Sequence, residues 1–195
     1  MNKFENNLYS GCNIKNHIFS GNYYFLHIHK TAGSAIKQFF GLNGNAPSHH
    51  PLTDDIIKAK KIVTVVRNPY DRMVSTYKYR KGKMGNNFKY NTFKEYITDN
   101  IPTPKYFEPQ VNYIKLNDKI IEPHTILRYE SLKSDLSQFI SDNNLKYNID
   151  DLKSIRVSTH KKDIHYKEFY TDELRDIVFN LYQDDFNYFN YDSEL

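Results

Sequence analysis

Short apolar runs alternate along the chain with segments whose apolar residues recur every three or four positions. The runs at 23–28 (YYFLHI), 61–66 (KIVTVV) and 125–129 (TILRY) have the length of strands. The unbroken β-branched run at 61–66 is typical of a central parallel strand covered on both faces. Strands that alternate with helical segments predict an α/β layer fold with a mainly parallel sheet.

The helical segments carry capping signals as well as apolar stripes. Asn68 can cap a helix and Pro69 suits its first turn, and Thr92 with Glu95 has the spacing of a capping box. Helices are expected after Gly33, from Pro69, around 92–97, at 131–140 and from Thr171. The buried stripe of the helix after Pro69 is expected to consist of Tyr70, Met73, Val74 and Tyr77.

The length of 195 residues suits one compact domain. Residues 1–22 are polar with few structural signals and are expected to form a loosely ordered arm, so the predicted domain spans residues 23–195. The proline-rich stretch 101–110 (IPTPKYFEPQ) is expected at the surface.

Charge and cysteine content narrow the function classes. A net charge of +4 fits an anionic substrate but is too weak to indicate nucleic-acid binding. A single cysteine, Cys12, excludes an internal disulfide. The apolar runs are too short to span a membrane, and the N-terminus lacks the apolar centre of a signal peptide. A soluble, cytoplasmic protein is therefore expected.

The first candidate site follows the run at 23–28. A strand–loop–helix junction offers backbone N–H groups and the positive end of a helix dipole, which together can hold a phosphate or sulfate. Gly33 lets the backbone approach an anion closely, Thr31 and Ser34 add hydroxyl groups, and Lys30 adds a charge. A structural turn with a capping serine and a solvated lysine is the alternative.

The second candidate site follows the run at 61–66. Arg67 ends an apolar strand, and Ser75 is expected on the face of the next helix opposite its apolar stripe. A guanidinium and a hydroxyl there could bind a second phosphate group. The alternative is an arginine paired with Asp71 or Glu95 and an exposed serine. Two such junctions on one sheet suggest a ligand with two separated anionic ends.

These motifs resemble those of the PAPS-dependent sulfotransferases. HIHKTAGSAI is similar to their 5′-phosphosulfate loop, and VVRNPYDRMVSTY is similar to their 3′-phosphate motif. SHHPLTDDI, TFKEYI followed by EPQVNYI, ILRYESLKSDLSQFI and the C-terminal segment favour the carbohydrate and glycosaminoglycan (family 2-like) branch. The resemblance covers roughly residues 23–191.

The resemblance implies a P-loop-kinase-like, three-layer α/β fold and transfer of a sulfuryl group from PAPS without a metal, leaving PAP. Lys30 would contact the 5′-phosphosulfate and its bridging oxygen, and Arg67 and Ser75 would bind the 3′-phosphate. The 5′ end of PAPS would be wrapped, mostly through backbone N–H groups, by Thr31, Ala32, Gly33, Ser34 and Ala35. The acceptor implied is a hydroxyl of a sugar or glycan.

A general base is expected for the acceptor hydroxyl. His50 is the first candidate because it matches a histidine of the family, with His49 and Glu130 as alternatives. A solvated loop histidine, or a glutamate that pairs with Arg128 or caps a helix, is the structural reading of these positions. Within the basic loop near residue 160, Lys161 or Lys162 would contact a phosphate or the acceptor, or would be solvated.

Other function classes fit less well. An ATP- or GTP-using P-loop enzyme, such as a nucleotide kinase, needs a lysine after the glycine, whereas Lys30 precedes Gly33. A non-catalytic nucleotide- or glycan-binding module would not need Lys30 and a base. The sequence also departs from the family pattern: it is short for the carbohydrate branch, Ala35 replaces a common serine or threonine, and no segment of it resembles the membrane anchor of Golgi relatives, as would also be so if an anchor had been trimmed.

Overall fold

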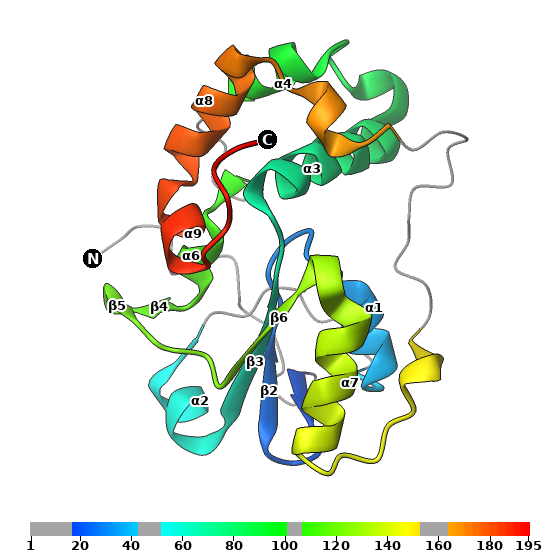
Figure 1. Ribbon diagram of the computed structural model, residues 1–195, viewed down its shortest axis with the longest axis vertical. Helices are drawn as coiled ribbons and strands as arrows, with labels where there is room; N and C mark the ends of the chain where they lie inside the picture. The colour runs from blue at the N-terminus through cyan, green and yellow to red at the C-terminus, as the bar shows by residue number, and fades with distance from the viewer. Residues whose placement is uncertain (1–16, 43–51, 101–106, 153–163) are drawn as a thin grey trace. The chain divides into compact units, whose positions relative to one another are not determined.

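The computed structural model of the protein describes residues 17–42, 52–100, 107–152 and 164–195 (Figure 1). The chain forms two compact units. We call residues 1–66 and 113–156 the sheet unit, and residues 67–112 and 157–195 the helical unit.

The sheet unit is built on four strands in the order β1-β2-β3-β6. Strands β2 (Tyr23–Leu26), β3 (Lys61–Val66) and β6 (Thr125–Arg128) are parallel, and β1 (Ile18–Phe19) is antiparallel to β2. Leu26 is opposite Thr64, whose hydroxyl donates to the Leu26 carbonyl. A separate hairpin joins β4 (Lys115–Leu116) to β5 (Lys119–Ile120). The carboxyl ends of the parallel strands therefore share one edge of the sheet.

Helices α1 (Gly33–Phe39) and α7 (Leu132–Asp142) cover one face of this sheet (Figure 1). Alternate strand residues point to that face, because successive side chains on a strand face opposite ways. The core there contains Phe25, Val63, Val65 and Leu127 from the strands, with Ile36, Phe39, Leu136 and Ile140 from the helices. The residues that alternate with them, such as Tyr24, Leu26 and Val66, are also buried. The short helix α2 (Asp54–Ala59) precedes β3.

The helical unit contains α3 (Pro69–Met84), α4 (Phe93–Asn100), α8 (Asp172–Leu181), α9 (Gln183–Tyr188) and all of α6 (Gln110–Tyr113) except its last residue. Its core is largely aromatic and includes Tyr70, Tyr77, Tyr96, Phe107, Tyr182 and Phe186. Short 3₁₀ turns at Gly85–Asn87 and Tyr166–Phe169 complete it, and two more, Tyr129–Ser131 and Ile149–Asp151, belong to the sheet unit.

Side chains cap the helices of this unit. The Asn68 side chain accepts from the N–H groups of Tyr70 (2.9 Å) and Asp71 (3.4 Å), as the sequence predicts. At α4, Thr92 accepts from the N–H of Glu95 as expected. Glu95 reaches back to the N–H of Asn91 rather than to that of Thr92.

The prediction of an α/β fold with a central, mainly parallel sheet flanked by helices is confirmed. The buried stripe Tyr70, Met73, Val74 and Tyr77 of α3 is confirmed as well. The surface placement of the proline-rich stretch is wrong for Phe107 and Gln110, which are 3% and 0% exposed. Residues 101–106 lie outside the described residues. The domain boundary stays a prediction.

The end of the predicted arm is ordered. Ile18–Phe19 forms β1, and the Phe19 ring stacks on Phe40 with centroids 3.9 Å apart. A strand of two residues leaves no periodicity in the sequence, which is why it was not predicted. No helix in the described part of the chain has the length and apolarity needed to cross a bilayer.

Candidate functional site

The loop between β2 and α1 has an unusual backbone. Lys30 has a φ angle of 65° and Ala32 one of 67°, both in the left-handed region that side chains other than glycine rarely adopt. Each such residue costs about 1 kcal/mol or more, and persists where the surrounding structure enforces it. This strain marks the loop as a place where backbone direction matters, since residues of this kind gather at ligand-binding sites.

Thr31 lies between these two strained residues and supports the loop from inside. Its side chain is fully buried, and its hydroxyl donates to the carbonyl of Ile28 at 3.0 Å. The hydroxyl hydrogen is therefore directed into the protein. The contact of Thr31 with the 5′ end of PAPS stays a prediction, and the group that would make it is the backbone N–H.

Gly33 begins α1 directly against the ring of His27. A Cβ atom at Gly33 would lie 1.8 Å from Cδ2 and 1.9 Å from Nε2 of His27. His27 is itself only 5% exposed and stacks on Phe25, so its ring has little room to move. The loop thus requires glycine at this position for close packing.

The start of α1 presents the remaining predicted groups. The Ala32 carbonyl accepts from the N–H groups of Ala35 (2.9 Å) and Ile36 (3.2 Å). The first-turn amides, those of Gly33 and Ser34 included, have no acceptor within an α-helix. Ser34 is exposed, whereas Lys30 and Ala35 are half-buried. Helix-start amides next to a lysine are groups that can bind an anion.

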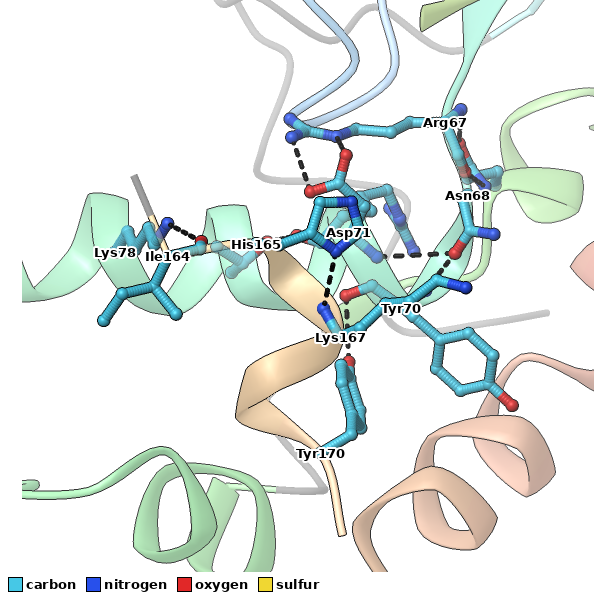
Figure 2. A network of polar contacts seen from close by, with 12 residues as sticks. Arg67, Asn68, Tyr70, Asp71, Lys78, Ile164, His165, Lys167 and Tyr170 are labelled. Atoms are coloured by element: carbon cyan, nitrogen blue, oxygen red, sulfur yellow. Dashed lines mark hydrogen bonds and ion pairs between the residues drawn. The ribbon is translucent and has the colours of Figure 1, made fainter. Parts of the chain in front are cut away.

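Arg67, the residue after β3, belongs to the helical unit and is paired with Asp71 (Figure 2). Nε donates to Oδ2 and Nη2 donates to Oδ1, each at 2.8 Å. The side chains are 12% and 19% exposed. This is the pairing expected under the structural alternative for Arg67. Asp71 thus accepts from two of the five guanidinium N–H donors.

Ser75 follows Asp71 by one helical turn, so both residues lie on the same face of α3. Both side chains are half-buried, whereas Met73, Val74 and Tyr77 on the opposite side are buried. The predicted separation of Ser75 from the apolar stripe is therefore confirmed. Its role in phosphate binding stays a prediction.

A residue that the sequence analysis did not single out holds the backbone of Arg67. The Gln110 side chain accepts from the Arg67 N–H at 2.9 Å and donates to the Arg67 carbonyl at 2.8 Å. Gln110 also contacts the buried carboxylate of Asp185. Burial raises the pKa of Asp185, and Arg72 and the N–H groups of Gln110 and Val111 oppose that effect. A buried glutamine has no periodic signal, although it stands in the EPQVNYI motif.

The structure describes only one of the candidate bases. Glu130 lies exposed in the 3₁₀ turn after β6. His49, His50, Lys161 and Lys162 lie outside the described residues. Among the residues that are described, no three His, Cys, Asp or Glu side chains are grouped to hold a metal ion.

The end of the basic loop is fixed to α3. Lys78 donates to the carbonyl of Ile164 at 3.4 Å, and the Tyr170 hydroxyl donates to the carbonyl of Tyr70 at 2.9 Å (Figure 2). His165 caps the 3₁₀ turn between them by accepting from the Lys167 N–H. The segment therefore packs along the helix that carries Ser75.

The model of the sulfotransferase family matches residues 20–192. The match includes both junctions and most of each unit. The chain belongs to the sulfotransferase family. No curated protein matches the chain, and no solved structure does. Membership makes this protein a transferase of sulfuryl groups.

Proposed function

We propose that the protein transfers the sulfuryl group of PAPS to a hydroxyl of a sugar or glycan. The loop after β2 carries this proposal: Lys30 and Ala32 are held in strained conformations directly before α1, in a chain of the sulfotransferase family. In this reading, residues 30–35 bind the 5′-phosphosulfate, and Arg67 and Ser75 bind the 3′-phosphate.

Sulfuryl transfer mainly requires that the protein places a positive charge beside the leaving phosphate. As the bond between sulfur and the bridging oxygen breaks, negative charge develops on the leaving phosphate. The Lys30 ammonium stabilises that charge, and one such donor contributes roughly 3–4 kcal/mol. The acceptor oxygen attacks sulfur and loses its proton to a general base, for which His50 is the first candidate and His49 the second. PAP and the sulfated acceptor are the products.

The residues present fit an adenosine bisphosphate better than a magnesium nucleotide. The loop has its lysine before Gly33, and a basic fork at Arg67 suits a second phosphate. PAP should therefore raise the melting temperature of the protein, and ATP with magnesium should raise it much less. Differential scanning fluorimetry with each ligand tests this, and equal shifts, or none, would contradict the proposed donor.

Two substitutions test the assigned groups. Lys30→Ala should lower the transfer rate by roughly a hundredfold or more and should also weaken PAP binding, because the oxygen on which the charge develops stays on the 5′-phosphate of PAP. Arg67→Ala should weaken PAP binding by about tenfold or more, since it removes a charge-assisted contact. Transfer measured with labelled PAPS and PAP affinity measured by calorimetry check both. An Arg67→Ala protein that binds PAP normally would contradict the assignment of the 3′-phosphate.

A non-catalytic PAP- or glycan-binding module on the same fold is the second candidate. Lys30 beside the 5′-phosphate would serve either function, because the oxygen at the cleaved bond stays with PAP, so only measured transfer distinguishes an enzyme from a binding module. A screen of hydroxyl acceptors with labelled PAPS decides between them.

A further inference from the structure

Gln110 is fully buried in the helical unit, and its side-chain amide contacts both peptide groups of Arg67. Oε1 accepts from the Arg67 N–H at 2.9 Å, and Nε2 donates to the Arg67 carbonyl at 2.8 Å. Paired bonds of this kind join neighbouring strands, where they fix the direction of the chain. Here they come from a side chain 43 residues away in the sequence. The backbone of Arg67 is thus held on both sides.

Asp185 of α9 holds the Gln110 amide in this orientation. Its Oδ2 accepts from Gln110 Nε2 at 3.2 Å and from the Gln110 N–H at 2.8 Å, and its Oδ1 accepts from the Val111 N–H at 2.8 Å. A carboxylate only accepts hydrogen bonds, so the NH₂ end of the amide must face it. The Oε1 end is then directed to the Arg67 N–H.

Arg72 completes a buried network behind Gln110. Its Nη2 lies 3.8 Å from Asp185 Oδ2 and donates to the Glu108 carbonyl at 2.7 Å, and the side chain is 2% exposed. Its guanidinium also lies over the ring of Tyr182, 4.9 Å from the centroid. Buried polar groups are costly unless satisfied, and satisfied networks are rigid. The network reaches the backbone of Arg67 through the Gln110 amide.

We infer that Gln110 is a positioning residue for recognition of the 3′-phosphate. Gln110 fixes the main chain of Arg67 while Asp71 fixes its guanidinium, so the charged fork is placed before the ligand arrives. A preorganised group loses less freedom on binding and so gives higher affinity. The inference rests on the proposed function, in which Arg67 binds the 3′-phosphate.

The competing explanation is that Gln110 only stabilises the helical unit. Loss of stability alone would affect every adenylate equally. A positioning role acts through Arg67, and therefore affects only ligands that carry a 3′-phosphate. PAP and adenosine 5′-monophosphate differ by that phosphate and form the matched pair of probes.

The experiment compares the affinities of both probes for the full-length wild type, Gln110→Met and Asn112→Ala by calorimetry. Methionine keeps the length of the side chain and removes its hydrogen bonds. We expect Gln110→Met to lose about tenfold or more in PAP affinity, and to bind adenosine 5′-monophosphate within about twofold of wild type. Asn112→Ala, on the same helix but bonded to Glu108, should bind both probes as wild type does.

A double mutant isolates the coupling. If Gln110 acts through Arg67, Gln110→Met should weaken PAP binding no further in the Arg67→Ala background. Gln110→Asn is the second variant if Gln110→Met does not fold, because it keeps an uncharged amide that faces Asp185 but is one methylene shorter and withdraws from the Arg67 backbone. We expect it to lose PAP affinity in the same selective way.

The outcomes distinguish failure of the positioning role of Gln110 from failure of the proposed function. If the wild type binds PAP more tightly than adenosine 5′-monophosphate and the Gln110 variants keep this preference, only the positioning role is overturned. Equal losses for both probes, or additive losses with Arg67→Ala, overturn it too. A wild type without any preference for PAP contradicts the assignment of Arg67, and the proposed function and the positioning role then fall together.

Discussion

At the residue scale, the tightest steric constraint described in the loop after β2 is the contact between Gly33 and His27. A methyl group at Gly33 would overlap the imidazole, whose ring is enclosed in the sheet unit. Since α1 begins at Gly33, relief of the overlap must move either the ring or the first turn of the helix. Movement of the first turn would displace the amides that are expected to bind the donor.

Gly33→Ala is therefore expected to destabilise the protein by roughly 1–3 kcal/mol or more and to weaken PAP binding. Gly82→Ala is the matched control: Gly82 lies in α3 with open space around the position of a Cβ, so alanine should stabilise by about 0.5–1 kcal/mol. Denaturant unfolding and calorimetry measure both effects.

The overlap can be tested by removing its other partner. His27→Ala creates space beside Gly33, so Gly33→Ala should cost less in that background than in wild type. Additive costs would mean that the imidazole is not the cause. Unchanged PAP binding in Gly33→Ala would mean that the loop tolerates a different start of α1.

The polar residues of the two junctions could be read from the sequence, but most of the hydrogen-bond partners of their side chains could not. Thr31 counted as a hydroxyl donor, whereas its hydroxyl donates inward to Ile28. Arg67 had Asp71 as a possible partner, and the structure shows that pair. Gln110 could not be found from spacing, because its partners lie 43 and 75 residues away. Contacts over such distances depend on the fold, not on local pattern.

At the element scale, the described helices differ at their first turn: in some, a side chain accepts hydrogen bonds from the first N–H groups, and in others none does. Asn68 accepts two N–H groups at the start of α3, whereas Ser131 precedes α7 without a side-chain capping bond. Serine and asparagine are both favoured at the position before a helix. The structure shows that only one of the two uses its side chain in this way.

Asn68→Ala should therefore lower the free energy of unfolding by about 1 kcal/mol, because two amides of α3 lose their acceptor. Ser131→Ala should change it by only a few tenths of a kcal/mol on the same reasoning. Chemical denaturation with both variants measures the difference. A cost for Ser131→Ala as large as that for Asn68→Ala would contradict the distinction.

The strands and long helices were predicted well, since their patterns are local. β3 spans the expected residues 61–66, and α8 starts after Thr171, which accepts from the Leu174 N–H. The hairpin β4–β5 and helix α9 were missed. Two-residue strands and a helix that follows directly on another leave no separate signal in the sequence.

At the scale of the whole molecule, stability depends on pH through every group whose pKa differs between the folded and unfolded states. Burial raises the pKa of Tyr70 to about 12, with Arg175 opposing it, and the Tyr70 hydroxyl donates to the Ser193 carbonyl. Burial also raises the pKa values of Tyr170 and Tyr182. All three tyrosines belong to the helical unit.

The direction in which stability changes with pH follows from the number of protons that the folded and unfolded states bind. Above the ordinary pKa of 10.0, the unfolded chain releases the Tyr70 proton while the folded protein keeps it until about pH 12. The stabilising contribution of this group is present below pH 10 and is lost as the pH rises towards 12, by an amount on the order of 2 kcal/mol. Tyr170 and Tyr182 act in the same direction.

Tyr70→Phe should therefore make the stability of the protein fall less steeply above pH 10, because phenylalanine has no proton to lose. Tyr79→Phe is the control, since Tyr79 is 42% exposed. Melting temperatures between pH 9 and 11, with tyrosinate absorbance followed in parallel, measure the difference. Identical alkaline profiles for wild type and Tyr70→Phe would show that Tyr70 does not hold its proton as its burial implies, and the alkaline sensitivity would then have to come from the other buried tyrosines.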